Sequence, residues 1–297
     1  MTKKSAIFFF GQDWRSAIIL AKILKSENCR ITAVITLPEK SRTGEKKPLP
    51  NPVRRLADKY RLATFNLTDL SLAIMTSKYR GDIGILASFG AKIPQEIINL
   101  FPKGILVIHP SLLPKYRGTT PVQAAILAGD SETGVTIFKM DKLFDHGPIL
   151  AQCKEKIRPD DTTPVLQKRL FSLGAEMLIA LLSDYLRGKL KLRSQNHSQA
   201  TCTIRLTRSA GKINWQRPDI EIERLTRAMS PWPGTWTEVK VKSQKTKIKE
   251  IKRLKILKAH LERNRLVLDQ IQLEGKKPVG WAQFQKGYPE AKIIRTR

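Results

Sequence analysis

The sequence has few of the residues that build metal centres and disulfide frameworks. Its three cysteines, Cys29, Cys153 and Cys202, are widely spaced and odd in number, and its four histidines are scattered along the chain. Neither set has the spacing of a zinc site or of a small domain held together by disulfides. We therefore predict no bound metal and no disulfide framework.

Long apolar runs are also lacking. No run approaches the roughly 18 apolar residues of a membrane span, and the apolar run Ala6–Phe10 near the start is too short for the core of a signal peptide. The turn that follows, Gly11-Gln12-Asp13, does not continue into the G-x-G-x-x-G pattern of a dinucleotide site. We expect a soluble cytoplasmic protein that is monomeric and does not contact membranes.

Acidic residues are scarce relative to basic ones. The chain has 26 Asp and Glu against 54 Lys and Arg, which gives a formal net charge of +28. Such an excess repels itself and contributes little to folding, but it favours a polyanionic partner, most often a nucleic acid. A general basic bias of the source lineage is the alternative explanation.

The N-terminal part alternates strand and helix patterns. Apolar runs at Ile7–Phe10, Ile31–Thr36, Ile83–Ala87 and Ile105–Ile108 predict buried strands, and Arg15–Lys25 has helical periodicity. Alternation of this kind is typical of an α/β domain with a doubly wound, largely parallel sheet. A long amphipathic helix is expected over 161–187.

The C-terminal part has a different pattern. Segments 237–241, 253–259 and 265–271 alternate polar and apolar residues and are separated by turn residues, which predicts a small antiparallel barrel. We predict a first domain over 1–188, a linker over 189–208, and a second domain over 209–297.

His109 directly follows the central predicted strand. In open α/β sheets, ligands bind beyond the carboxyl ends of the strands, so His109 is a candidate acid–base group. Asp145 lies in the turn Asp141–Pro148, and a carboxylate brought beside His109 would orient the imidazole and stabilise its cation. The alternatives are a histidine that only ends a strand and an acid that is only solvated in a turn.

Basic residues concentrate in two segments. On a strand, alternate side chains share one face, so lysines in the second domain would form a basic stripe. The polar loop over 37–52 is either a cationic arm for phosphates or a solvated connection. The predicted nucleic-acid contacts are Lys40, Arg42, Lys46, Lys47, Lys240, Lys242, Lys245, Lys247 and Lys249.

Several motifs carry a family resemblance. The stretch His109–Gly118, HPSLLPKYRG, is similar to the signature of the folate-dependent formyltransferases, and Met140 followed by DHGP at 145–148 resembles their M-D-x-x-x-D-T-G pattern. Three further stretches, at 46–53, 231–234 and 274–278, are similar to motifs of one branch of that superfamily. The chain thus resembles the methionyl-tRNA formyltransferase family along nearly its whole length.

The resemblance implies a Rossmann-like formyltransferase domain followed by an OB-like β-barrel domain that binds tRNA. It implies 10-formyltetrahydrofolate as the formyl donor and the amino group of methionyl initiator tRNA as the acceptor. His109 and Asp145 would be catalytic. The implied folate contacts are Ala87, Ser88, Phe89, Gly90, Ser111, Leu112, Leu113, Pro114, Lys142, Leu143 and Phe144.

One position departs from the family pattern. The family has a catalytic Asn two residues before the His, where this chain has Val107, and valine cannot donate a hydrogen bond. Losing one donor to a tetrahedral oxyanion costs roughly 10²–10³ in rate. The sequence therefore allows a slow enzyme, a rearranged oxyanion site, or a tRNA-binding homologue without catalysis. Another formyltransferase, acting on an amino sugar or a purine precursor, is a further alternative.

Overall fold

The computed structural model describes residues 5–27, 29–38, 51–67, 81–242 and 249–295. These residues divide into two compact units. The described parts of Met1–Gly118, Glu132–Lys156 and Gln167–Cys202 form the first, and those of Thr119–Ser131, Ile157–Leu166 and Thr203–Arg297 form the second. The first unit holds the predicted catalytic residues.

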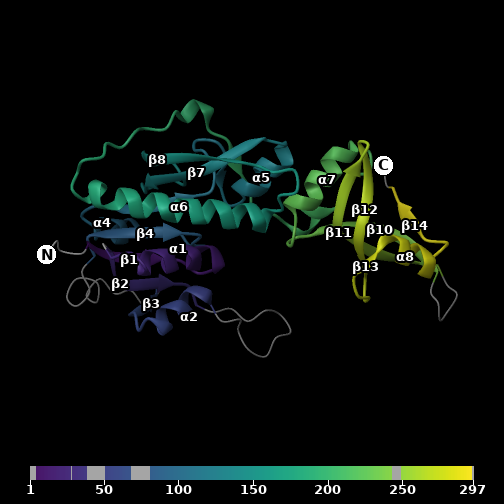
Figure 1. The fold of residues 1–297 in the computed structure, drawn as a ribbon, viewed down its shortest axis with the longest axis horizontal. Helices are drawn as coiled ribbons and strands as arrows, with labels where there is room; N and C mark the ends of the chain where they lie inside the picture. Colours follow the sequence, from purple (N-terminus) through teal and green to yellow (C-terminus); the bar gives the residue numbers. More distant parts are fainter. Residues whose placement is uncertain (1–4, 28, 39–50, 68–80, 243–248, 296–297) are drawn as a thin grey trace. The chain divides into compact units, whose positions relative to one another are not determined.

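The first unit is built on a seven-stranded sheet with the order β3-β2-β1-β4-β5-β7-β8 (Figure 1). The five strands from β3 to β5 are parallel, and β7 and β8 continue the sheet antiparallel. The strands are β1 (Ser5–Phe10), β2 (Cys29–Thr36), β3 (Thr64–Asn66), β4 (Ile83–Ala87), β5 (Ile105–His109), β7 (Glu132–Lys139) and β8 (Ile149–Lys156). A short ladder joins β6 (Arg117–Gly118) to β9 (Cys202–Thr203).

Helices cover both faces of this sheet because its strands are apolar on both sides. In β1, Ile7 and Phe9 join one core, while Phe8 and Phe10 join the other. The first core is completed by helices α1 (Trp14–Leu24), α2 (Pro52–Lys59) and α6 (Thr163–Leu186), and the second by α4 (Gln95–Asn99). Burial on both faces explains why these strands are continuous apolar runs.

The second unit contains a five-stranded antiparallel sheet with the order β13-β12-β11-β10-β14. Its strands are β10 (Thr235–Lys242), β11 (Lys249–Glu262), β12 (Arg265–Leu273), β13 (Val279–Gly280) and β14 (Lys292–Ile294). The helices of this unit include α5 (Pro121–Ala128), α7 (Asp219–Ala228) and α8 (Trp281–Gly287). Ile222 of α7 and Phe284 of α8 are buried against the inner face of the sheet.

The predicted fold class is confirmed, with an α/β sheet followed in sequence by an antiparallel sheet. Strand β8 and helix α8 were not predicted, because Ile149–Lys156 reads as mixed polar and apolar and α8 is one short segment. The predicted domain limits stay a prediction. Residues 189–202, predicted as a linker, lie in the first unit, where Arg193 pairs with Ile149 of β8.

Candidate active site

His109 lies at the carboxyl end of β5, as its sequence position predicts. Its side chain is only 7% exposed, and its backbone pairs with Thr136 of β7. The ring nitrogen Nε2 lies 3.0 Å from the carbonyl oxygen of Tyr116. A carbonyl only accepts hydrogen bonds, so Nε2 carries the proton in this arrangement. The other ring nitrogen, Nδ1, is then the one that can take up a further proton.

Asp145 lies on the side of Nδ1. Its Oδ2 is 3.6 Å from His109 Nδ1 and accepts a hydrogen bond of 2.8 Å from the backbone N–H of Gly118. The residue has a φ of +48°, a conformation that Asp tolerates better than most side chains. Gly147 allows this turn to lie close to β7, because a Cβ at that position would be 1.9 Å from the carbonyl oxygen of Lys139. Turn chemistry therefore aims the carboxylate at the imidazole.

The loop after His109 is fixed by hydrogen bonds to β7 and β8. Thr136 Oγ1 donates to the carbonyl oxygen of Ser111 at 2.6 Å and accepts from the N–H of Leu113 at 3.0 Å. Gln152 Nε2 donates to the carbonyl oxygen of Leu113 at 2.8 Å, and Ser111 Oγ donates to the carbonyl oxygen of Lys115 at 2.6 Å. The predicted folate contacts over Ser111–Pro114 therefore belong to a rigid segment.

Val107 is on the same face of β5 as His109, because alternate residues of a strand share a face. Its side chain is 6% exposed and packs in an apolar cluster that includes Leu113, Phe138 and Phe10. An amide at position 107 would thus lie next to His109 along the strand. Valine offers no hydrogen-bond donor there.

The segment Ala87–Gly90 emerges beside His109, because β4 and β5 are parallel neighbours and Ala87 pairs with Ile108. The sequence predicted this shared edge, and the structure confirms it. Ser88 has a φ of +47°, and its Oγ donates to Asp13 Oδ2 at 2.8 Å. Asp13 also caps the N-terminus of α1, so the predicted folate segment is tied to the turn after β1.

The turn Asp141–Pro148 exposes apolar side chains. Leu143 is 53% exposed and Phe144 is 67% exposed, while Lys142 is also at the surface. Exposed apolar groups on a turn that is otherwise held in place are typical of a ligand-binding rim. This exposure agrees with the prediction that residues 142–144 contact folate, which stays a prediction.

Of the predicted phosphate contacts, three can be located. Lys240, Lys242 and Lys249 are exposed on the outward face of β10 and β11, where Lys242 pairs with Lys249. Strand β10 alternates between buried Thr235, Thr237, Val239 and Val241 and the outward residues between them. Lys40, Arg42, Lys46, Lys47, Lys245 and Lys247 lie outside the described residues.

Sequence reasoning missed Gln195, Arg117 and His197 as parts of this site. Gln195 Nε2 donates to the carbonyl oxygens of Asp145 at 3.0 Å and Gly147 at 2.8 Å, and its Oε1 accepts from Arg117 Nη2 at 2.7 Å. Gln195 is 50 residues from Asp145 in sequence, and no spacing rule relates the two. A polar residue in an irregular segment gives no periodic signal.

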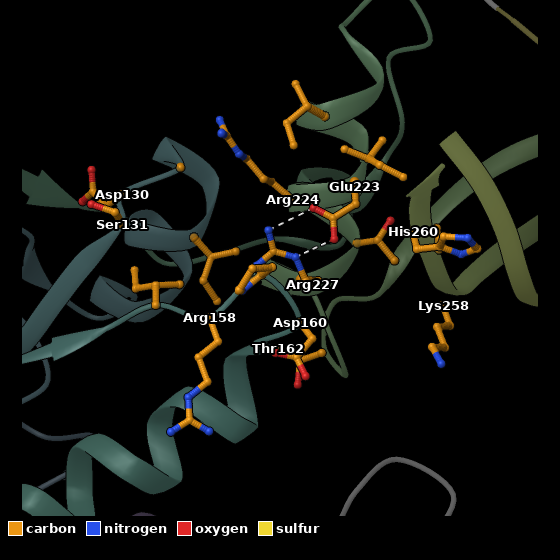
Figure 2. A pocket seen from close by; sticks show the side chains of 18 of the residues that line it. Asp130, Ser131, Arg158, Asp160, Thr162, Glu223, Arg224, Arg227, Lys258 and His260 are labelled. Atoms are coloured by element: carbon orange, nitrogen blue, oxygen red, sulfur yellow. Dashed lines mark hydrogen bonds and ion pairs between the residues drawn. The ribbon is translucent and has the colours of Figure 1, made fainter. Parts of the chain in front are cut away.

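The second unit contains a cavity of about 590 Å³ (Figure 2). Aliphatic residues line much of it, among them Ile126, Ile157 and Leu257. On its wall, Arg227 donates two hydrogen bonds to the carboxylate of Glu223, at 2.5 and 2.9 Å. None of the predicted catalytic or folate-binding residues lines this cavity.

Neither a metal centre nor a membrane helix was found among the residues that the structure describes. No group of three or more His, Cys, Asp or Glu side chains in that part of the chain is placed to hold a metal ion. No helix in it combines the length and apolar character needed to cross a bilayer.

Comparison with known proteins finds formyltransferases that match most of the chain. The formyl transferase family matches residues 3–182, and the formyl transferase C-terminal domain matches residues 205–265. A methionyl-tRNA formyltransferase of Roseiflexus castenholzii is 33% identical over 298 residues, covering 95% of each chain. One from Chloroflexus aggregans is 41% identical over 234 residues, covering 78% of this chain and 75% of the relative.

Solved structures share the fold at lower identity. An N-formyltransferase of Helicobacter canadensis, in complex with folinic acid and dTDP-3-aminofucose, aligns with a TM-score of 0.63 at 18% identity, covering 92% of this chain and 98% of that one. HypX of Aquifex aeolicus, in complex with tetrahydrofolic acid, aligns with a TM-score of 0.65 at 16% identity, covering 95% of this chain and 47% of that one.

Proposed function

The chain belongs to the methionyl-tRNA formyltransferase family, and we propose that it transfers the formyl group of 10-formyltetrahydrofolate to the amino group of methionyl initiator tRNA. The observation that carries the proposal is the approach of His109 and Asp145 at the carboxyl edge of the sheet, with 3.6 Å between Nδ1 and Oδ2. The end of a strand and a separate turn thus supply an acid–base pair where α/β sheets bind ligands.

The reaction requires one proton to leave the amine and one to reach the departing folate nitrogen. The neutral amine attacks the formyl carbon, and the bond from that carbon to the folate nitrogen then breaks. His109 Nδ1 accepts the amine proton, because Nε2 remains hydrogen-bonded to Tyr116. The imidazolium then returns a proton to the leaving nitrogen. Asp145 stabilises the cation that forms when Nδ1 gains the proton, and the carbonyl of Tyr116 keeps the neutral ring oriented through Nε2.

The attack also places negative charge on the formyl oxygen. A side-chain amide at position 107 is absent, so this oxygen has one donor fewer than the family resemblance predicts. Donors directed at such an oxygen often make the largest single contribution to catalysis. We therefore propose slow turnover compared with a homologue that has the Asn.

The exposed lysines of β10 and β11 support tRNA as the acceptor. Lys240, Lys242 and Lys249 present several positive charges on one face of the antiparallel sheet, which suits a phosphate backbone. The name of the relatives, methionyl-tRNA formyltransferase, supports tRNA as the acceptor. Structures of the same fold in complex with folate compounds support a folate as the donor. A monomeric state and a cytoplasmic location remain predictions.

The test is single-turnover formyl transfer to charged initiator tRNA. We expect His109→Ala and Asp145→Asn each to lower the rate by about 10²–10⁴. His260→Ala is a matched control, because His260 also pairs with a carboxylate, Asp269, at 2.9 Å but on the exposed surface of the second unit. Equal rates for His109→Ala and the parent would remove His109 from the mechanism.

A small amine is the competing acceptor, since the solved protein with dTDP-3-aminofucose has the same fold. The two acceptors differ in salt dependence. Acceptor binding that falls steeply between 50 and 200 mM salt indicates RNA, because phosphate contacts release counterions. Transfer to an amino sugar nucleotide that is insensitive to salt and faster than transfer to charged tRNA would replace the proposal.

A further inference from the structure

The segment from Arg193 to Thr201 lies directly against the loops of the site. Arg193 exchanges two backbone hydrogen bonds with Ile149, of 2.7 and 2.8 Å. At the other end, the carbonyl oxygen of Thr201 accepts from the N–H of Arg117 at 2.8 Å, and its Oγ1 accepts from the N–H of Tyr116 at 2.8 Å. Both anchors belong to the first unit, so the residues between them are held over the Asp145 turn.

Gln195 is the residue between these anchors that reaches the turn. Its side chain is buried, and its amide uses both donors and the acceptor in one arrangement. The NH₂ group faces two carbonyl oxygens, of Asp145 and Gly147, and the oxygen faces the guanidinium of Arg117. A rotated amide would place its oxygen against two carbonyls and its NH₂ against a cation, so the orientation is fixed.

A pair of histidines extends this contact. The rings of His146 and His197 are stacked, with 4.0 Å between centroids and 2° between planes. His146 Nδ1 is 2.7 Å from Asp141 Oδ2, and His197 Nδ1 accepts from Arg117 Nη2 at 2.8 Å. Since a guanidinium only donates, His197 Nδ1 is unprotonated. The Asp145 turn is thus linked to Arg117 by two routes, through Gln195 and through the stack.

We propose that Gln195 is a positioning residue for catalysis, which holds the carboxylate of Asp145 toward His109, and that the His146–His197 stack and Arg117 hold Gln195 in place. This inference rests on the proposed function. The Asp145 backbone carbonyl is fixed by Gln195 and its carboxylate by Gly118, so both ends of the residue are restrained. Loss of one restraint lets the carboxylate shift, and a misplacement of about 1 Å can cost roughly 10² in rate.

The main test compares Gln195→Ala with Gln199→Ala. Gln199 is exposed on the same segment, so it is a matched control for changes in the segment itself. We expect Gln195→Ala to lower kcat by about 10- to 100-fold with KM for donor and acceptor within about twofold, and Gln199→Ala to match the parent. Gln195→Glu is expected to be as impaired as Gln195→Ala, because a carboxylate cannot donate to the two carbonyls.

A double variant separates positioning from general structure. If Gln195 acts through Asp145, Gln195→Ala adds no further loss to Asp145→Asn, whereas independent effects multiply. Hydrogen exchange of residues 141–147 gives a readout apart from activity, and we expect it to be faster in Gln195→Ala than in the parent and in Gln199→Ala. Three results would overturn the inference. These are rate losses of Gln195→Ala and Asp145→Asn that multiply in the double variant, an unchanged kcat of Gln195→Ala in an active enzyme, and unchanged hydrogen exchange of residues 141–147. If the parent protein has no transfer activity, the proposed function is refuted instead. The hydrogen exchange of residues 141–147 then decides by itself whether Gln195 holds the Asp145 turn.

Discussion

Replacing Val107 with asparagine tests the chemistry of the site most directly. Val107 pairs with Leu86 on one side and Phe138 on the other, so the new side chain is held on a central strand of the sheet. It also shares a strand face with His109. Asparagine and valine are similar in volume, so the change introduces an amide without a large change in packing volume.

The cost of this change follows from burial. Val107 is 6% exposed, and removing a buried valine loses about 1.5–3 kcal/mol of apolar burial. A buried amide without a partner adds about 1–3 kcal/mol. Typical domain stabilities are about 5–15 kcal/mol, so the variant is expected to fold with a lower midpoint of urea unfolding. The catalytic gain from one oxyanion donor is about 2.7–4 kcal/mol.

The assay is single-turnover transfer to charged initiator tRNA, measured after urea unfolding has shown that the variants are folded. We expect Val107→Asn to be about 10²-fold faster than the parent. Val107→Ala is the control, since it loses packing without gaining a donor, and we expect it to be no faster than the parent. A folded Val107→Asn enzyme that is no faster would refute the reasoning and indicate that other groups already bind the oxyanion.

Three further outcomes follow from charge and burial. The pKa of His197 lies below its ordinary value because stacking removes water and because His146 and Arg117 add positive charge, although Asp141 opposes this shift. Protonation of His197 therefore favours the unfolded state. The free energy of unfolding should fall as the pH drops below about 6.5. His197→Phe should flatten this dependence in urea titrations between pH 7 and 5, and an unchanged slope would contradict it. Burial raises the pKa of the Cys29 thiol, so iodoacetamide should modify the exposed Cys202 first, as peptide mapping can check. Glu223→Gln should destabilise the chain by about 3 kcal/mol, because Arg227 is left as a nearly buried cation without its carboxylate. The control Glu221→Gln removes an exposed ion pair, and its effect should stay below about 0.5 kcal/mol. Equal urea midpoints for the two variants would contradict a stabilising role of the Glu223–Arg227 pair.

The sequence by itself determined the apolar central strands of the sheet and the position of His109 at the end of one of them. Runs such as Ile83–Ala87 and Ile105–Ile108 are apolar throughout, and short runs of this kind in an α/β pattern are typical of strands buried on both faces. The parallel order then brings their carboxyl ends to one edge. The turn around Asp145 could also be predicted from the sequence, because Gly147 and Pro148 favour a fixed turn.

Only the tertiary structure decided how that edge becomes a site. The direction of Asp145 depends on the N–H of Gly118 and on Gln195, and the protonated nitrogen of His109 depends on the carbonyl of Tyr116. These contacts join residues that are distant in sequence or lie in irregular loops. No periodic pattern in the sequence predicts such contacts. Periodicity encodes which face of an element is buried, but hydrogen bonds between loops depend on the packed backbone.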